Sequence, residues 1–379
     1  MKLDSPPAGL AALDYFPADY SASRDRFLRA AQRAGAECQR HEFDAEGPNG
    51  ERLSCDTARL GPPQPARLLI VSSGLHGVEA YLGAALQTAL LDRLENARAL
   101  PAETGLLLVH ALNPYGFAHS RRCDAENIDP NRNLLAPGEP YLGTPPGYGE
   151  LDRLLNPTGP PRRFEFFFLK AAITLLRMGR ERAMTAVAGG QHDFPHGLFF
   201  GGRAPSAVLR LLEGNYARWV GNAARVLHLD IHTGLGPWAT HEVITNRPAE
   251  SPMAAALREV FGEKLRAVSE SQAVRYTTRG DLNSWCDSQV LENRGAALCV
   301  EFGTYSPLRV LAALRRENQA RHSCSAGDPA LAAAQRELRE VFAPQASRWR
   351  ERAFHGGWET VARALEEIGP AGRFSREIA

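Results

Sequence analysis

The sequence predicts a three-layer α/β/α fold with a mixed, mostly parallel sheet. Short runs rich in Val, Leu and Ile are typical of buried strands, and longer segments with helical periodicity separate them. Such alternation favours a sheet covered by helices on both faces. Neither an internal repeat nor a long Gly/Ser linker is visible, so residues 1–379 are expected to form a single domain. The predicted strands span 66–71, 104–112, 224–232 and 295–303.

Other elements are predicted from local signals. A hairpin with GPNG as its turn is expected over 37–61, at the sheet edge. After the first predicted strand, leucine and alanine residues recur on one face of an expected helix. Further along the chain, Ser306-Pro307 and Asp328-Pro329 each place a helix-capping residue before a proline. The expected helices span about 79–96, 307–318, 329–344 and 358–368.

A large insertion is predicted between residues 134 and 224. It contains FEFFFLKAAITLLRMG, which is too rich in apolar residues for an exposed helix, and QHDFPHGLFFGGR. His192 and His196 in the second segment are candidates for a second metal site, but a structural role is favoured. The insertion is expected to fold over the cleft as a wall or lid and so restrict the substrate to a small molecule.

The composition excludes several function classes. A net charge of +1, from 44 basic and 43 acidic residues, gives no global electrostatic reason to expect nucleic acid or a membrane surface as partner. No segment approaches the roughly 20 apolar residues of a membrane span, and the first residues lack a signal core. The six cysteines include no C-x-x-C pair. A cytoplasmic protein is expected, either a monomer or a homo-oligomer.

Two histidines and a carboxylate lie at the ends of predicted strands. His76 and Glu79 follow the first run in SSGLHGVEAY, and His232 follows the third in LDIHTGLG. Ligands of open α/β sheets bind at the carboxyl ends of strands. A lone histidine there is usually structural, but two imidazoles and one carboxylate are a ligand set of catalytic zinc sites. The sequence therefore predicts one Zn²⁺ per chain.

Further polar residues belong to the same edge. Glu301 lies near the end of the fourth predicted strand, after six uncharged residues. Burial of a carboxylate costs free energy unless the group has a partner or a function that offsets it. A general base role toward zinc-bound water would be such a function, whereas a salt bridge is the structural alternative. The segment IDPNRN brings Asp129, Asn131 and Arg132 together, and an arginine fork with an amide donor suits a substrate carboxylate.

Taken together, HGVE, DPNRN, IHTG and VEFG resemble motifs of the zinc carboxypeptidases of the M14 class. The sequence is more similar still to the bacterial DUF2817-type M14-like proteins, over about Cys55 to Asn318. Succinylglutamate desuccinylase and aspartoacylase share related elements. The resemblance implies a carboxypeptidase-like fold, with His76, Glu79 and His232 as zinc ligands and Glu301 as the base.

The resemblance also implies roles for neighbouring residues. Asn131 and Arg132 would hold the terminal carboxylate of the substrate, and Asp129 would orient the first zinc histidine. An arginine would polarise the scissile carbonyl, and Arg122 is preferred over Arg121.

Two weaker matches concern substrate contacts. Tyr276 keeps the spacing to Trp285 of a mobile tyrosine that closes over the substrate, although simple packing explains the pair equally well. Asn283 would then lie in the specificity pocket, where it suits neither an aromatic nor a basic terminus.

The predicted function is zinc-dependent cleavage of an amide bond adjacent to a free carboxylate, with Glu301 activating the water. The sequence does not separate a carboxypeptidase that acts on small peptides from a deacylase that acts on N-acyl amino acids. A non-catalytic metal-containing binding protein is the alternative from another class.

Overall fold

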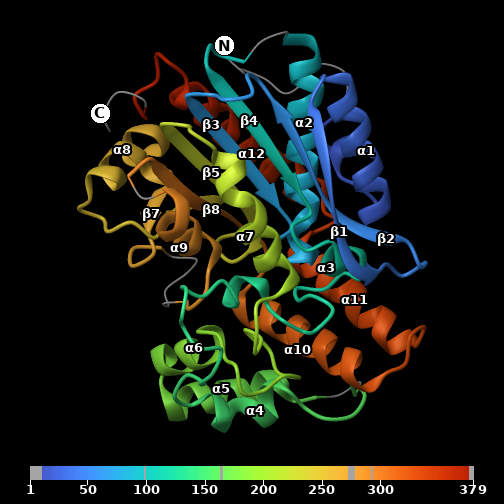
Figure 1. The fold of residues 1–379 in the computed structure, drawn as a ribbon. Helices are drawn as coiled ribbons and strands as arrows, with labels where there is room; N and C mark the ends of the chain where they lie inside the picture. The colour runs from blue at the N-terminus through green and yellow to red at the C-terminus, as the bar shows by residue number, and fades with distance from the viewer. Residues whose placement is uncertain (1–10, 98–99, 163–164, 272–277, 292, 375–379) are drawn as a thin grey trace.

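The sheet at the centre of the molecule is mixed. The computed structural model describes residues 11–97, 100–162, 165–271, 278–291 and 293–374, and in these residues eight strands lie in the order β1-β2-β4-β3-β5-β8-β6-β7 (Figure 1). The strands are β1 Glu37–Glu46, β2 Arg52–Leu60, β3 Arg67–Ser73, β4 Thr104–His110, β5 Arg225–Gly234, β6 His241–Thr245, β7 Leu265–Ala267 and β8 Gly295–Gly303.

Strand direction places one set of ends together. The four central strands β4, β3, β5 and β8 are parallel neighbours, whereas the β1–β2, β2–β4 and β6–β8 pairs are antiparallel. The carboxyl ends of the central strands therefore meet at one edge of the sheet.

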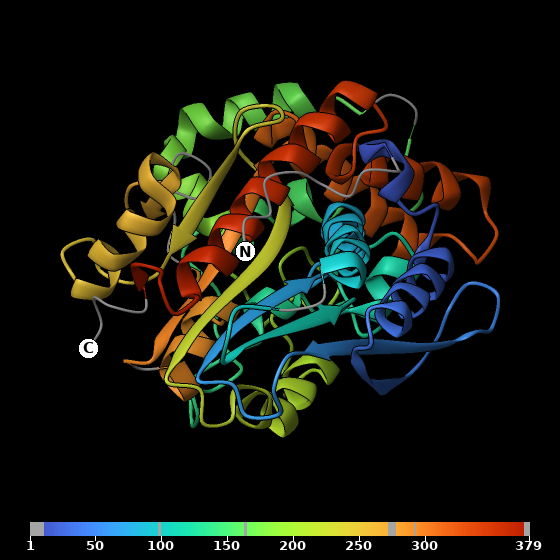
Figure 2. The ribbon, with the colours of Figure 1, turned by 90° about the horizontal axis from the view of Figure 1, so that it is seen from above.

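Helices cover both faces of the sheet (Figure 2). In β3, Leu69 and Val71 pack into the core beneath α1, α2 and α12, while Leu68 and Ile70 pack into the core beneath α7 and α9. The helices are α1 Tyr20–Arg33, α2 Ala80–Ala97, α3 Pro114–Ala118, α4 Tyr148–Leu155, α5 Phe167–Met178, α6 Arg180–Ala188, α7 Ala207–Val220, α8 Pro252–Phe261, α9 Leu282–Cys286, α10 Pro307–Ser323, α11 Pro329–Phe342 and α12 Ser347–Ile368. The predicted three-layer fold class is confirmed.

Most predicted elements are present with shifted ends. The four apolar runs form β3, β4, β5 and β8, and the hairpin forms β1 and β2 with β1 at the edge. The last helix begins at Ser347 rather than Trp358 because Trp349, Ala353 and Phe354 continue its buried face. The short strands β6 and β7 were not predicted.

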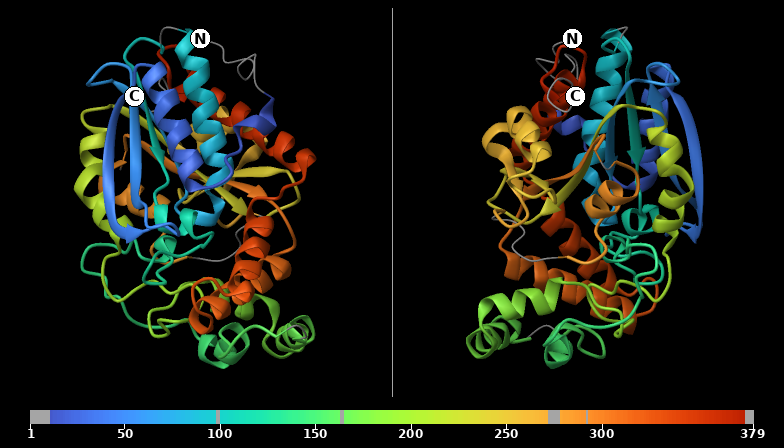
Figure 3. Two further views of the ribbon diagram at one scale, coloured as in Figure 1. Left: turned by 90° about the vertical axis from the view of Figure 1, so that its right-hand side faces the viewer. Right: turned by 60° about the vertical axis from the view of Figure 1, so that its left-hand side comes forward.

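The insertion divides into two parts. Helix α7 packs on the sheet as part of the core, whereas α4, α5 and α6 form a lobe beyond the carboxyl ends of the strands (Figure 3). The expectation that the apolar segment around α5 is too apolar to be exposed is wrong, because most of this helix faces solvent. Among the described helices, none combines the length and apolar character that a membrane crossing requires.

Candidate metal centre

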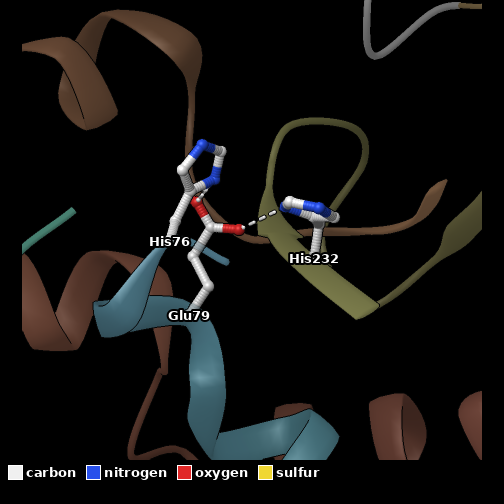
Figure 4. Close-up of side chains that lie close together, drawn as sticks. All are labelled: His76, Glu79 and His232. Atoms are coloured by element: carbon white, nitrogen blue, oxygen red, sulfur yellow. Dashed lines mark hydrogen bonds and ion pairs between the residues drawn. The ribbon is translucent and has the colours of Figure 1, made fainter. Parts of the chain in front are cut away.

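His76, Glu79 and His232 converge at the carboxyl ends of β3 and β5. Their side chains are buried, and one ligand atom from each lies within 4.8 Å of the other two. Nδ1 of His76 lies 2.9 Å from one carboxylate oxygen of Glu79, and Nδ1 of His232 lies 3.0 Å from the other. Glu79 is thus placed between the two imidazoles (Figure 4).

The turn after β3 sets this geometry. His76 is followed by the 3-10 turn Gly77–Glu79, in which the Glu79 amide donates to the His76 carbonyl. A Cβ at Gly77 would lie 2.0 Å from the Gly116 carbonyl carbon, so only glycine lets this turn pack against α3. His232 comes from β5, which is a rigid central strand.

A carboxylate contacts the outer nitrogen of each histidine. Nε2 of His76 lies 3.1 Å from Asp129, and Nε2 of His232 lies 2.5 Å from Asp230. Because Nε2 of each ring is engaged, each ring presents Nδ1 to Glu79. Asp129 therefore lies where the resemblance placed it. Asp230 was missed, although its position two residues before His232 on the same strand face was the available signal.

Asp129 and Asp230 are themselves held in place. The Arg122 side chain donates to Asp129 at 2.8 Å, and the backbone N–H of Asn131 donates to it at 3.0 Å. The hydroxyl of Ser72 donates to Asp230 at 2.5 Å. Both carboxylates are fully or almost fully buried, so the imidazole orientations are fixed from outside the ligand cluster.

The donor set fits a zinc ion. In the described part of the chain, the buried Nδ1 of His76 has no hydrogen-bond partner, although it lies close to Glu79. An unsatisfied buried nitrogen is unusual in a native structure. Two imidazole nitrogens and one carboxylate also match the donors of zinc sites that keep an open position.

The ionisation of these groups is strongly coupled. Burial raises the pKa of Glu79, but the charge and close contact of His76 and the hydrogen bond from His232 outweigh it and hold this pKa below its ordinary value. Burial lowers the pKa of His232, but the charges of Asp230 and Glu79 and their hydrogen bonds raise it well above the usual range. A divalent cation would take the place of the proton on His232.

Glu301 lies on the strand beside His232. The two residues are register partners between β5 and β8, so their side chains share one face of the sheet. One oxygen of Glu301 accepts a hydrogen bond of 2.8 Å from the Leu235 amide. Burial and the charge of Glu79 raise the pKa of Glu301 to about 7.

The structure separates the two candidate arginines. Arg122 reaches the ligand cluster, with one nitrogen 3.2 Å from Glu79. Arg121 instead forms a buried ion pair of 2.8 Å with Glu317 and donates to Asn127. Only Arg122 faces the candidate metal centre.

Asn131 and Arg132 follow Asp129 in a 3-10 turn. The Asn131 amide oxygen accepts from the Leu282 backbone at 2.9 Å, which leaves its NH₂ group as a donor. Arg132 is 2% exposed and donates to the carbonyls of Ala188 and Asn131. Among the described residues it forms no direct ion pair, although its charge helps to lower the pKa of buried Asp129.

Phe199, from the insertion, contacts both arginines. Its ring centre lies 5.5 Å from the guanidinium carbon of Arg122 and 5.7 Å from that of Arg132. Its backbone φ of 56° is in the left-handed region, which is strained for an aromatic residue. No sequence signal identified this residue, because the contact depends on how the insertion folds.

The remaining candidates do not join the cluster in the described residues. Tyr276 lies outside those residues. Asn283 is buried on α9, next to the Leu282 amide that contacts Asn131. His192 pairs with the Gly202 carbonyl at 2.7 Å, and His196 contacts His322 at 3.1 Å, so neither adds to the candidate metal centre.

Loss of either histidine should remove the metal. His76→Ala and His232→Ala are expected to reduce bound zinc from one ion per chain to a small fraction after dialysis against a zinc buffer, because each supplies a nitrogen ligand. Elemental analysis measures this content. His355→Ala, which changes an exposed histidine on α12, is the matched control. Full zinc content in either ligand variant would remove that histidine from the site.

Glu301 should make the stability of the metal-free protein depend on pH. The pKa of Glu301 rises from an ordinary 4.5 to about 7 on folding. Its stabilising contribution is therefore complete below the lower value and lost as pH rises through the higher one. From a pH below 4.5 to a pH above 7, the wild type should therefore lose about 3 kcal/mol of unfolding free energy that Glu301→Gln does not lose, as measured by urea denaturation. An identical difference at both pH values would contradict this.

The chain matches a protein-family model and shows distant likenesses to solved structures. No curated protein matches the sequence. Distant fold likenesses include carboxypeptidase A of Helicoverpa armigera, at 13% identity and TM-score 0.45 over 93% of this chain and 75% of that one. Bovine thrombin-activatable fibrinolysis inhibitor has 9% identity and a TM-score of 0.46, over 88% of this chain and 99% of that one. A metallo-carboxypeptidase from Burkholderia cenocepacia has 15% identity and a TM-score of 0.43, over 87% of this chain and 69% of that one.

The family match is more extensive than the predicted resemblance. The protein-family model described as "Protein of unknown function (DUF2817)" matches residues 16–355. The sequence motifs indicated a shorter resemblance, over about residues 55–318. Because this match covers most of the sequence, the chain belongs to the DUF2817 family.

Proposed function

We propose that the protein is a metal-dependent hydrolase, with zinc as the expected ion, that cleaves an amide bond next to a free carboxylate. The observation that carries this proposal is the placement of Glu301. A carboxyl group with a pKa of about 7 lies on the strand that pairs with the His232 strand, next to the three-residue ligand cluster. A buried carboxyl group beside a metal-ligand cluster, with its pKa raised by burial, is typical of general base catalysis.

His76, Glu79 and His232 would hold the ion. Zinc there would supply Lewis acidity toward the substrate carbonyl and the attacking water. The Leu235 amide donates to one oxygen of Glu301 and the Cys299 thiol lies 3.9 Å from the other, so the carboxyl group that would accept the water proton is held in place. The same carboxyl group then delivers this proton to the leaving amine nitrogen.

Arg122 would stabilise the charge that develops on the carbonyl oxygen. Its guanidinium is positioned by Asp129 and contacts Glu79, so it is held beside the ligand cluster before substrate arrives. A preorganised cation at the developing oxyanion lowers the barrier because it needs no reorganisation.

Arg132 and Asn131 support a carboxylate-bearing substrate. Arg132 is almost fully buried and forms no direct ion pair among the described residues, and a buried guanidinium is stabilised by a hydrogen-bonded anion. A substrate carboxylate would supply that contact, in addition to the longer-range charge of Asp129. The amide of Asn131 adds a neutral donor beside it. Both a small peptide and an N-acyl amino acid present such a carboxylate, so the proposal includes peptidase and deacylase activity.

Glu301→Gln should abolish turnover without affecting metal content. A screen of dipeptides and N-acyl amino acids identifies the substrate, and kcat of the variant is expected to fall by roughly 10²- to 10⁴-fold because proton transfer is lost. Zinc content should stay at the wild-type level. Glu351→Gln, an exposed change on α12, is the control.

A different result would favour the binding-protein alternative. Wild-type protein with full zinc content that hydrolyses no substrate of the panel would contradict the hydrolase proposal.

Arg132→Lys tests the carboxylate contact. Lysine keeps the charge but loses the planar fork, so KM for substrates with a free carboxylate should rise about 10- to 100-fold. KM for the matching carboxamides should change little. Thermal unfolding checks that the variant is folded. Equal increases in KM for acids and amides would show that Arg132 does not contact the carboxylate.

A further inference from the structure

Helix α5 carries a concentrated apolar surface. Of the eight exposed large hydrophobic residues among those described, six lie on α5 or directly before it. The most exposed are Leu176 at 86%, Phe166 at 71% and Leu169 at 60%. The other three are Phe168, Ile173 and Leu175. Contiguous exposed apolar side chains of this kind mark an interaction surface, whereas isolated ones do not.

The buried side of α5 determines which of its residues face solvent. Phe167 and Ala171 are buried, and Arg315 of α10 lies 5.2 Å from the Phe167 ring centre. Arg315 also donates to the Leu154 carbonyl and pairs with Glu165. The α4–α6 lobe is thereby anchored to α10, and the apolar residues face outward because the opposite stripe is already packed.

Helix α5 carries charges of one sign, and basic residues outnumber acidic ones by seven to four over residues 148–188. Residues 166–178 contain Lys170 and Arg177, both exposed, and no acidic residue. Arg153 and Arg162 of the same lobe are also exposed. In the described residues no ion pair is assigned to any of these four cations.

The acidic side chains described in the lobe are already engaged. Glu150 pairs with Arg182, Glu165 pairs with Arg315, and Asp152 accepts a hydrogen bond from Asn156. The local surface is therefore apolar and cationic, although the whole chain has a net charge of only +1.

We propose that the exposed face of α5 docks on an anionic lipid surface. Phe and Leu side chains would enter the boundary between headgroups and acyl chains, and Lys170 and Arg177 would lie at the level of the phosphates. Two weak contributions of this kind, apolar burial and attraction to anionic lipid, together give reversible binding. The proposal is independent of the hydrolase function.

Charge complementarity favours lipid over a second copy of the chain. The stripe Phe166, Leu169, Ile173 and Leu176 has the 3-4-3 spacing of a helix-pairing seam. Pairing of two copies along this seam would bring Lys170 and Arg177 of both copies, all of them cations, close to one interface, and residues 166–178 contain no acid to separate them. An anionic surface compensates both cations.

Vesicle co-sedimentation tests the proposal. Wild-type protein should bind vesicles of mixed phosphatidylglycerol and phosphatidylcholine at least about tenfold more tightly than vesicles of phosphatidylcholine alone, and salt should weaken the binding. Leu169→Glu with Leu176→Glu should abolish binding. Lys170→Gln with Arg177→Gln should weaken it by about 5- to 30-fold.

A matched control distinguishes loss of the α5 surface from a general effect of the protein's net charge on vesicle binding. Ser21→Glu with Arg29→Gln makes the same charge change as the leucine pair at exposed positions of α1 and should leave binding unchanged. Circular dichroism checks that each variant is folded. Absence of wild-type binding to anionic vesicles, or equal loss in the control, would overturn the proposal. A wild-type dimer by light scattering that the leucine variant dissociates would also overturn it, in favour of a second copy as the occupant.

Discussion

The contact of one carboxylate with two imidazoles organises the site. Glu79 is buried, and its two oxygens face Nδ1 of His76 and Nδ1 of His232. A buried carboxylate needs positive charge or hydrogen bonds to remain ionised, and the histidines supply both. The parallel β3 and β5 bring these residues together from positions far apart in the sequence. Asp129 and Asp230 then fix each imidazole from the far side, so the ligand nitrogens are oriented before any ion arrives.

The insertion contributes contacts to the candidate metal centre. The carbonyl of Ala188 accepts from Arg132, and the carbonyl of Phe200 accepts from the Asp129 amide at 2.7 Å. Phe199 contacts both arginines while holding a strained backbone conformation. Residues 188–200 therefore position the arginine side chains relative to the ligand cluster. This part of the insertion thus packs against the candidate metal centre, whereas the α4–α6 lobe offers a separate surface.

Sequence reasoning succeeded where one rule connects pattern to geometry. Apolar runs predicted the central strands, and the rule that ligands lie at their carboxyl ends predicted His76, Glu79 and His232 as neighbours. Asp230 was missed because its role depends on which face of the strand holds His232. Phe199 was missed because its contacts with the arginines depend on how the insertion folds. The burial of α5 was predicted wrongly because apolar density shows that a segment needs a partner, not that the partner lies within the same chain.

The central claim is that His76, Glu79 and His232 bind one zinc ion with an open position. Zinc K-edge X-ray absorption on the zinc-loaded protein tests it most directly, because nitrogen, oxygen and sulfur ligands differ in bond length. The account predicts two imidazole nitrogens and carboxylate or water oxygens at about 2.0 to 2.2 Å, with no sulfur shell. A sulfur shell at about 2.3 Å, or zinc surrounded by oxygen without imidazole scattering, would contradict it.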